Sequence, residues 1–351
     1  MNKDPVNKDL PLKVMCRALY KEMGYCTHYE VRLRTKTYIE AFKSHDLSYI
    51  DVIGYSFSPD LSYSVIGAEC KSGESHALDE IYKFMGIANY YGLHKAYFVK
   101  TKLHSNARNV AVSKGMSTYD AAELRQLLLG LSIDVDKQSK IETALYNRIS
   151  SAHRHVASID PKLHSYILFE YWNRDDWRNI HNLIHLLKNT NSYAKQNITL
   201  DLKYYHYLVL ELFIRATLLV LHKAMNLSLS DLPNSLTVML YGSADSLNER
   251  RQLSDLISQT IGKDERFEPS WQNSFLELCG RFSERPYQSS LMPKMIQDIL
   301  DDGFFKDMLM IDGRIMKKYD DIVRKFTQDV IHFLKTSANI NIDLFEEFLK
   351  T

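Results

Sequence analysis

The sequence predicts an α/β domain followed by an all-α helical-bundle domain. Strand patterns, in which residues alternate in polarity or form short apolar runs, are confined to about the first 130 residues. A helical pattern separates two of these runs, which predicts a parallel crossover joined to an antiparallel hairpin, and hence a mixed sheet flanked by helices. From about residue 131 helical periodicity dominates, and a helical bundle is the expected architecture. We therefore expect one domain over residues 1–130 and a second over 131–351.

The first domain is expected to have the element order α, β, β, β, α, β, α, β, α. Apolar residues spaced by three and four positions predict its helices, and Gly24 and Gly92 are expected to end two of them. The expected helices are 10–23, 77–91, 106–114 and 120–129, and the expected strands are 26–34, 50–57, 63–71, 95–101 and 116–119. The polar stretch 35–48 is expected to form a loop over the site.

The second domain is expected to consist of helices and to select substrate, mediate oligomerisation or bind a partner. The expected helices are 136–157, 163–188, 200–225, 252–261, 270–282, 292–300, 313–336 and 342–349. The most apolar run, 207–221, contains Glu211 and Arg215, so it predicts a buried core helix and no membrane span.

Composition narrows the class of protein. Of the 351 residues, 45% are hydrophobic and 25% are charged, as in ordinary globular proteins, and the formal net charge of +1 gives no overall basic field for nucleic acid. The four cysteines are scattered without a CxxC pair, which argues against a zinc site or a disulfide framework. The first residues contain no apolar segment typical of a signal peptide, so a cytoplasmic location is expected.

Two apolar runs in the first domain each carry an acid. Asp51 lies at one end of the first run, and the second run ends in Glu69-Cys70-Lys71. Side chains on a strand alternate between faces, so Glu69 and Lys71 should point the same way and Cys70 the other. If the runs pair as a hairpin, a carboxylate from each meets beside a lysine, which suits a hard divalent cation held by oxygen ligands.

The first domain resembles the PD-(D/E)xK, or restriction-endonuclease-like, superfamily, and in particular its Mrr-like and Holliday-resolvase-like branch. The features that carry the resemblance are the opening helix ending in Gly24-Tyr25, then Asp51-Val52-Ile53-Gly54, then Glu69-Cys70-Lys71. A helix with Gly86 and Tyr90 and the strand 96–101 follow them. The resemblance covers residues 10–129, about a third of the chain, and implies a restriction-endonuclease-like fold.

The resemblance implies roles for four residues. Asp51 and Glu69 would bind Mg²⁺ or Mn²⁺, and the backbone carbonyl of Cys70 would be a further ligand. Lys71 would orient or help deprotonate the attacking water, or stabilise charge on the phosphate. The implied reaction is in-line hydrolysis of a phosphodiester.

The sequence departs from the family pattern at the first helix, where many relatives have a glutamate. This neighbourhood holds Lys13, and the nearest acid in the helix, Glu22, is at the wrong end. Glu40, His45 or Asp46 in the preceding loop is a substitute ligand to consider. Basic residues after the fourth strand are expected to contact phosphate; they are Lys100, Lys102 and Arg108.

The leading interpretation is a metal-dependent endonuclease acting on nucleic acid, with DNA favoured over RNA, in a bacterial defence or restriction-type role. A second hypothesis keeps the nuclease-like domain as a nucleic-acid- or protein-binding module with weak or no catalysis. A third places ribonuclease chemistry in the helical half. There, Arg174 with His181 and Arg215 with His222 have the spacing of HEPN-type ribonucleases, a spacing that chance produces about as often.

Overall fold

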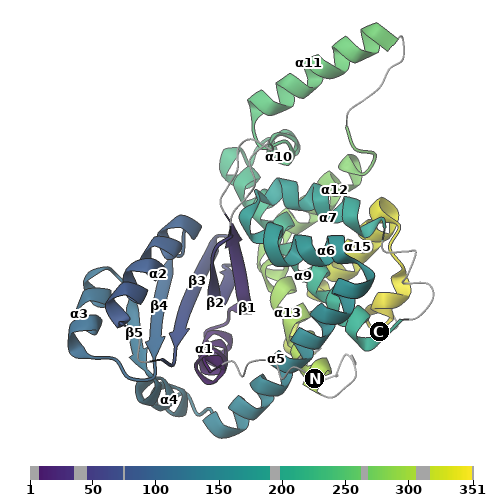
Figure 1. Ribbon diagram of the computed structural model, residues 1–351. Helices are drawn as coiled ribbons and strands as arrows, with labels where there is room; N and C mark the ends of the chain where they lie inside the picture. The colour runs from purple at the N-terminus through teal and green to yellow at the C-terminus, as the bar shows by residue number, and fades with distance from the viewer. Residues whose placement is uncertain are drawn as a thin grey trace. The chain divides into compact units, whose positions relative to one another are not determined.

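The computed structural model describes residues 8–34, 46–73, 76–189, 198–261, 268–305 and 317–349. The chain divides into two compact units (Figure 1). The first contains residues 1–56, 63–151 and 166–173, and the second contains 57–62, 152–165 and 174–351. The first unit is a mixed sheet with helices and the second is helical, which confirms the α/β-plus-helical layout expected from the sequence.

The first unit follows the predicted element order. Its helices are α1 (Leu10–Glu22), α2 (Ala77–Tyr91), α3 (Ser105–Ser113), α4 (Ala121–Gly130) and the first part of α5 (Val135–Ile159). Its strands are β1 (Cys26–Arg34), β2 (Asp46–Phe57), β3 (Tyr63–Lys71), β4 (Lys95–Lys100) and β5 (Ser117–Asp120). The expected loop over 35–48 is wrong at its end, because β2 already begins at Asp46 and pairs there with Arg34 of β1. Residues 35–45, with Glu40 and His45, lie outside the described part of the chain.

The five strands lie in the order β1-β2-β3-β4-β5. β1 and β2 are antiparallel, β2 and β3 are neighbours joined by the turn 58–62, and β3-β4 and β4-β5 are parallel pairs. Helix α2 makes the crossover between β3 and β4, and α3 makes the crossover between β4 and β5. The predicted combination of a hairpin and a parallel crossover is confirmed.

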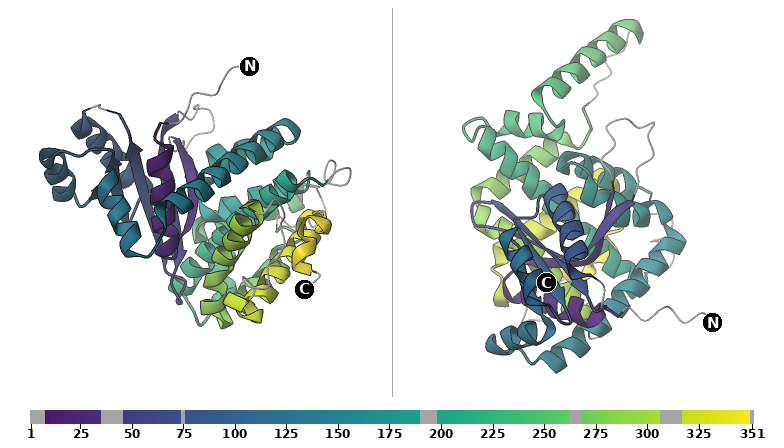
Figure 2. Two further views of the ribbon diagram at one scale, coloured as in Figure 1. Left: turned by 90° about the horizontal axis from the view of Figure 1, so that it is seen from below. Right: turned by 60° about the vertical axis from the view of Figure 1, so that its left-hand side comes forward.

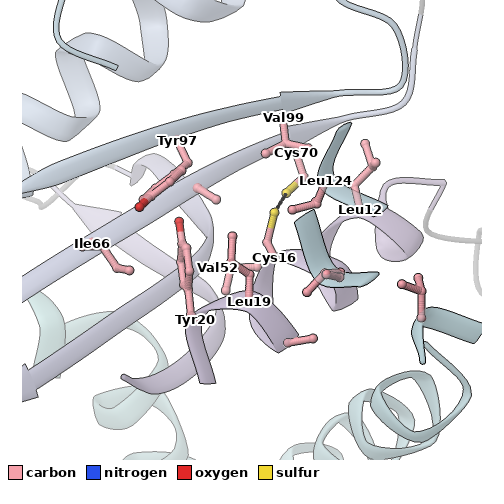
Figure 3. Packing of buried hydrophobic residues seen from close by; sticks show 14 residues of the cluster. Leu12, Cys16, Leu19, Tyr20, Val52, Ile66, Cys70, Tyr97, Val99 and Leu124 are labelled. Carbon is pink, nitrogen blue, oxygen red and sulfur yellow. Dashed lines mark hydrogen bonds between the residues drawn. The ribbon is translucent and has the colours of Figure 1, made fainter. Parts of the chain in front are cut away.

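Each face of the sheet is covered by helices, with a separate apolar cluster on each side. Helices α1 and α4 pack on one face against Val52, Cys70 and Val99, as Figure 3 shows from close by. Helices α2 and α3 pack on the other face against Ala96 and Phe98. The strands are therefore buried on both sides, which explains why β3 and β4 have short continuous apolar runs.

The start of α5 belongs to the first unit because of a buried charge. Glu142 is fully buried and accepts hydrogen bonds from Arg17 Nη1, from Tyr29 Oη at 3.2 Å and from Gln138 Nε2 at 3.0 Å, while Lys21 Nζ lies 3.3 Å away. Arg17 is itself only 2% exposed. This network fastens α5 to α1, so the first unit extends beyond the boundary at residue 130 that we expected from the change in periodicity.

The second unit is a set of helices around α9 (Leu200–Leu227), and Figure 2 shows no strand among them in the described residues. α9 packs against α7 (Asp176–Leu187), α10 (Leu232–Leu240) and α13 (Pro286–Phe305). The remaining helices are α6 (Pro161–Ser165), α11 (Ala244–Ile261), α12 (Gln272–Glu284), α15 (Asp321–Ala338) and α16 (Glu346–Leu349), with a 3-10 turn η3 at Ile342–Phe345. Burial of Tyr207–Leu221 confirms the expected core helix, and no helix of the described residues has the length and apolarity to cross a membrane.

The prediction of one continuous helix over 163–188 is wrong. After α6 the chain forms a π-helical turn (Tyr166–Glu170) and a 3-10 turn (Tyr171–Asn173) before α7 begins. Phe169 packs under the guanidinium groups of Arg32 and Arg34, at 4.9 and 4.4 Å from its ring centre. The Asn173 side chain accepts a hydrogen bond from Arg34 N and donates one to Arg32 O. These contacts with β1 replace continued helical hydrogen bonds, which a periodic apolar pattern does not reveal.

The buried network predicts a large effect of substituting Glu142. In the Glu142→Ala variant Arg17 loses its buried partner, so we expect the free energy of unfolding to fall by about 3–5 kcal/mol, measured by urea denaturation. A matched control on the same helix is Asp136→Ala, which removes an exposed pair with Arg125 and should change stability by no more than about 0.5 kcal/mol. Equal effects of the two substitutions would contradict a structural role for the network.

Candidate metal and phosphodiester site

The structure brings the three predicted catalytic residues together. The Asp51 carboxylate is fully buried on β2, and its Oδ2 accepts a hydrogen bond from Cys70 N of β3 at 2.8 Å. On β3, Lys71 Nζ lies 2.6 Å from Glu69 Oε1 and 3.6 Å from Asp51 Oδ2. One ammonium group therefore lies between carboxylates from two neighbouring strands.

Strand alternation gives Cys70 a different role from its two neighbours. Its side chain is fully buried, and its Sγ lies 3.6 Å from Cys16 Sγ in the cluster beneath α1 (Figure 3). Glu69 and Lys71 point to the site, as the alternation predicted. Cys70 thus meets the site through its backbone only. Its N–H holds Asp51, and its carbonyl remains a predicted metal ligand.

Lys13 of α1 adds a second ammonium group to the site. From the sequence, Lys13 was notable only because it lies where many relatives of the resembled family have a glutamate. Its side chain is 3% exposed, and Nζ lies 2.8 Å from Asp51 Oδ1 and 2.7 Å from Glu30 Oε1. The helix start is tied to the end of β3, because Ser72 N donates a hydrogen bond to Asp9 Oδ1 at 2.6 Å. Asp9 O in turn accepts from Lys13 N, so this contact sets the position of Lys13 beside Asp51.

Glu30 of β1 is a third carboxylate at the site, and the sequence pattern did not predict it there. In the register of β1 and β2, where Tyr29 pairs with Val52 and Val31 with Ile50, Glu30 lies opposite Asp51. Its backbone has φ 53°, a left-handed conformation that non-glycine residues rarely adopt and that is found most often at functional positions. Besides Lys13, its Oε1 accepts a hydrogen bond from Tyr146 Oη at 3.1 Å. The only signal in the sequence was an acid on the polar face of a strand that pairs with β2.

Tyr49 borders the site on β2. The ammonium groups of Lys13 and Lys71 lie 5.5 and 5.6 Å from the centre of its ring, within the range of cation–π attraction. Tyr49 is 42% exposed, whereas Asp51 two residues later is fully buried. An exposed aromatic ring therefore lies beside the ammonium groups of Lys13 and Lys71.

The pKa values of Glu69, Lys13 and Lys71 are all raised, but for different reasons. Burial, followed by repulsion from Asp51, raises the pKa of Glu69 to about 7, although Lys71 and Lys13 lower it. Burial alone would lower the pKa values of Lys13 and Lys71, but attraction to Asp51 and to Glu30 or Glu69 outweighs burial and raises both. At neutral pH both lysines are therefore ammonium ions, and Glu69 is close to its own titration point.

The donor set of the two acids fits one hard divalent cation. Glu69 Oε2 is buried and accepts no hydrogen bond from the described residues, whereas Asp51 Oδ1 lies 2.8 Å from Lys13 Nζ. A buried carboxylate oxygen is costly unless a cation or a donor meets it. Two carboxylate oxygens, completed by water, are a usual set of ligands for Mg²⁺. Among the described residues, no group of three or more His, Cys, Asp or Glu side chains has a metal-binding arrangement. The residues in place to hold an ion are therefore Asp51 and Glu69, with the Cys70 carbonyl.

The basic residues expected to contact phosphate differ in their surroundings. Lys100 is buried and its Nζ is hydrogen-bonded to Glu80 Oε2 of α2 at 2.9 Å. Arg108 forms two hydrogen bonds with the Glu123 carboxylate, at 2.7 and 2.8 Å. Lys102 is exposed at the end of β4. Contact with phosphate remains a prediction for all three, and Lys102 has the most accessible charge.

The histidines of the two Arg–His segments in the helical unit both have packing or hydrogen-bonding roles. His181 Nε2 lies 3.2 Å from Leu240 O, and its ring packs edge-on against Trp177 and Trp271. His222 Nε2 is 3.0 Å from the side-chain nitrogen of Asn226 on the same helix.

Comparison with known proteins gave no match to a family model, a curated protein or a solved structure.

The raised pKa of Glu69 predicts how the stability of the metal-free protein depends on pH. Between about pH 4.5, the ordinary pKa of a glutamate, and pH 7 the folded state binds more protons than the unfolded state. The contribution of Glu69 to the free energy of unfolding therefore falls as pH rises. In Glu69→Gln this fall is absent, because glutamine does not titrate. The stability of the variant relative to wild type should therefore rise across this window, by on the order of 3 kcal/mol.

The measurement is urea denaturation in EDTA at a series of pH values. Asp136→Asn, at an exposed position on α5, is the control and should give a curve parallel to that of wild type. A Glu69→Gln curve that also stays parallel to wild type would show that Glu69 titrates normally.

Proposed function

We propose that the first unit is a metal-dependent nuclease that hydrolyses phosphodiester bonds of nucleic acid, with DNA favoured. The observation that carries this proposal is the convergence of Asp51 and Glu69 on Lys71, with a buried Glu69 Oε2 that accepts no hydrogen bond from the described residues. The sheet order and the crossover through α2 are those that a restriction-endonuclease-like fold requires, which supports the family resemblance. A bacterial defence role follows from that resemblance, and a cytoplasmic location is proposed from the scattered cysteines.

In this mechanism Asp51 and Glu69, with the Cys70 carbonyl, would hold Mg²⁺ or Mn²⁺. When bound, the ion would supply Lewis acidity to the phosphodiester and to water. The Cys70 N–H fixes the Asp51 carboxylate in place. Water attacks phosphorus in line, and the bond to the leaving oxygen breaks.

Of the two roles considered for Lys71, stabilisation of charge fits its surroundings better than proton abstraction. Its pKa is raised, so its Nζ keeps its proton at neutral pH and offers a positive charge to the phosphate. A bound cation would keep the Glu69 carboxylate ionised as its ligand, so the proton of the attacking water would pass to solvent.

The second candidate function, a binding module with weak or no catalysis, is favoured by one observation. Lys13 already lies 2.8 Å from Asp51 Oδ1, so an ammonium ion competes with a metal for this oxygen. Binding of nucleic acid without cleavage, with each divalent metal tried, would support this function over the first.

The helical unit is proposed to bind a partner or a second copy of the chain. In Figure 1, helix α11 extends beyond the other helices of this unit, and its Leu253 and Leu256 are 50% and 59% exposed. A single site cuts one strand at a time, so two copies of the chain are the usual arrangement for cutting both strands of a duplex.

Cleavage of plasmid DNA and of RNA tests the proposed chemistry. We expect cleavage by the full chain with Mg²⁺ or Mn²⁺ and none in EDTA. Asp51→Asn and Lys71→Met should each lower the rate by at least about 100-fold, because each removes a group that holds the metal or stabilises charge on the phosphate. Lys83→Met, at an exposed lysine of α2, should cleave like wild type.

Full activity of Asp51→Asn or Lys71→Met would exclude this site. Metal-independent cleavage of RNA that is lost in His181→Ala or His222→Ala would instead point to the helical unit.

The salt dependence of nucleic-acid binding tests whether Lys102 contacts phosphate. Lys102→Ala should weaken binding to all sequences alike and lower the slope of log K against log salt concentration by about 1, since one phosphate contact is lost. Fluorescence anisotropy of labelled DNA in Ca²⁺, at several salt concentrations, measures this slope. Lys114→Ala, an exposed lysine beyond the other end of α3, should leave the slope unchanged. An unchanged slope for Lys102→Ala would remove Lys102 from the interface.

A further inference from the structure

Lys13 bridges two carboxylates that come from different strands. Its Nζ lies 2.8 Å from Asp51 Oδ1 on β2 and 2.7 Å from Glu30 Oε1 on β1, with 3% of the side chain exposed. A single buried cation between two acidic oxygens is also how proteins hold a divalent metal, at oxygen distances of about 2.0–2.6 Å. The ammonium group, with its longer contacts, thus fills a position in which an ion with two oxygen ligands would fit.

The neighbours of Lys13 keep this bridge in place. Tyr146 Oη donates to the same Glu30 oxygen at 3.1 Å, and Glu30 has the left-handed φ of 53°. A strained residue in a strand persists only when the surrounding contacts determine its conformation. Here those contacts turn the Glu30 carboxylate toward Lys13 and Asp51.

The charge balance explains why a cation is needed at this position. Asp51 and Glu30 together contribute two negative charges, and Asp51 is fully buried. Two close carboxylates repel each other unless a cation lies between them. Lys71 interacts with Asp51 from the other side, where its Nζ is 3.6 Å from Oδ2 and 2.6 Å from Glu69. Each carboxylate pair thus has its own lysine.

We propose that Lys13 is a resident cation that takes the place of a divalent ion between Asp51 and Glu30. It is a positioning residue, because it acts through the two carboxylates it holds. The consequence is that the chain binds a single metal ion, at Asp51 and Glu69, and needs no metal to neutralise the Asp51–Glu30 pair. This consequence rests on the proposed function, whereas the replacement of an ion by Lys13 does not.

The test counts bound Mn²⁺ by the electron paramagnetic resonance signal of the free ion, with the full chain titrated at neutral pH. We expect one ion per wild-type chain and two per chain of Lys13→Met, which is similar in length to lysine but has no charge. The double variant Lys13→Met/Glu30→Gln should return to one ion, because the new pair of ligands is lost. Lys83→Met controls for the loss of a lysine and should bind as wild type does.

The counts separate this inference from the proposed function. One additional ion in Lys13→Met supports the inference, whether wild type binds one ion or none, and no additional ion overturns it. A wild type that binds none contradicts the metal-dependent nuclease in either case. An additional ion that persists in the double variant overturns the assignment to Glu30.

A folding measurement covers the case in which Lys13→Met does not fold without metal. If Lys13 replaces an ion, we expect Mn²⁺ to restore the circular dichroism spectrum of wild type to Lys13→Met, and K⁺ at equal ionic strength not to restore it. Failure of Mn²⁺ to restore it would show that the ammonium group has a packing role that no ion can replace.

Discussion

The buried carboxylate of Asp51 is the constraint on which the first unit depends. A charge removed from water costs several kcal/mol unless it is paired and hydrogen-bonded. Asp51 receives an N–H from β3, an ammonium group from β3 and another from α1. Without β3 the carboxylate would lose its N–H donor and one ammonium group, and without α1 it would lose the other ammonium group. The geometry of the candidate site and the packing of α1, β2 and β3 therefore depend on the same contacts.

Helix α1 connects this site to the rest of the unit through little more than one turn. Lys13 reaches the site, Cys16 packs against Cys70 under the sheet, and Arg17 pairs with the buried Glu142 of α5. Residues three and four positions apart share one side of a helix, so this single face contributes a charge, an apolar contact and a second charge. Helix α1 is thus the element that places two buried cations, Lys13 and Arg17.

The two lysines of the site differ in exposure and in the carboxylates that they contact. Lys71 lies between the acids proposed to hold the metal and is 20% exposed, so its charge can reach a phosphate. Lys13 is 3% exposed and acts only on Asp51 and Glu30. A lysine at this position neutralises a carboxylate pair that otherwise would require an ion.

The sequence by itself determined the element order, the hairpin with its crossover, and the grouping of Asp51, Glu69 and Lys71, because strand alternation and apolar periodicity are local properties. Only the tertiary structure decided that Lys13, Glu30 and Tyr49 complete the site. Their approach depends on the register between strands, on a left-handed residue at Glu30 and on the tie between Asp9 and Ser72. The tertiary structure also decided that the helix breaks after α6 and that the first part of α5 belongs to the first unit. In both cases polar contacts between elements distant in the chain outweighed a periodic pattern, and periodicity carries no information about such contacts.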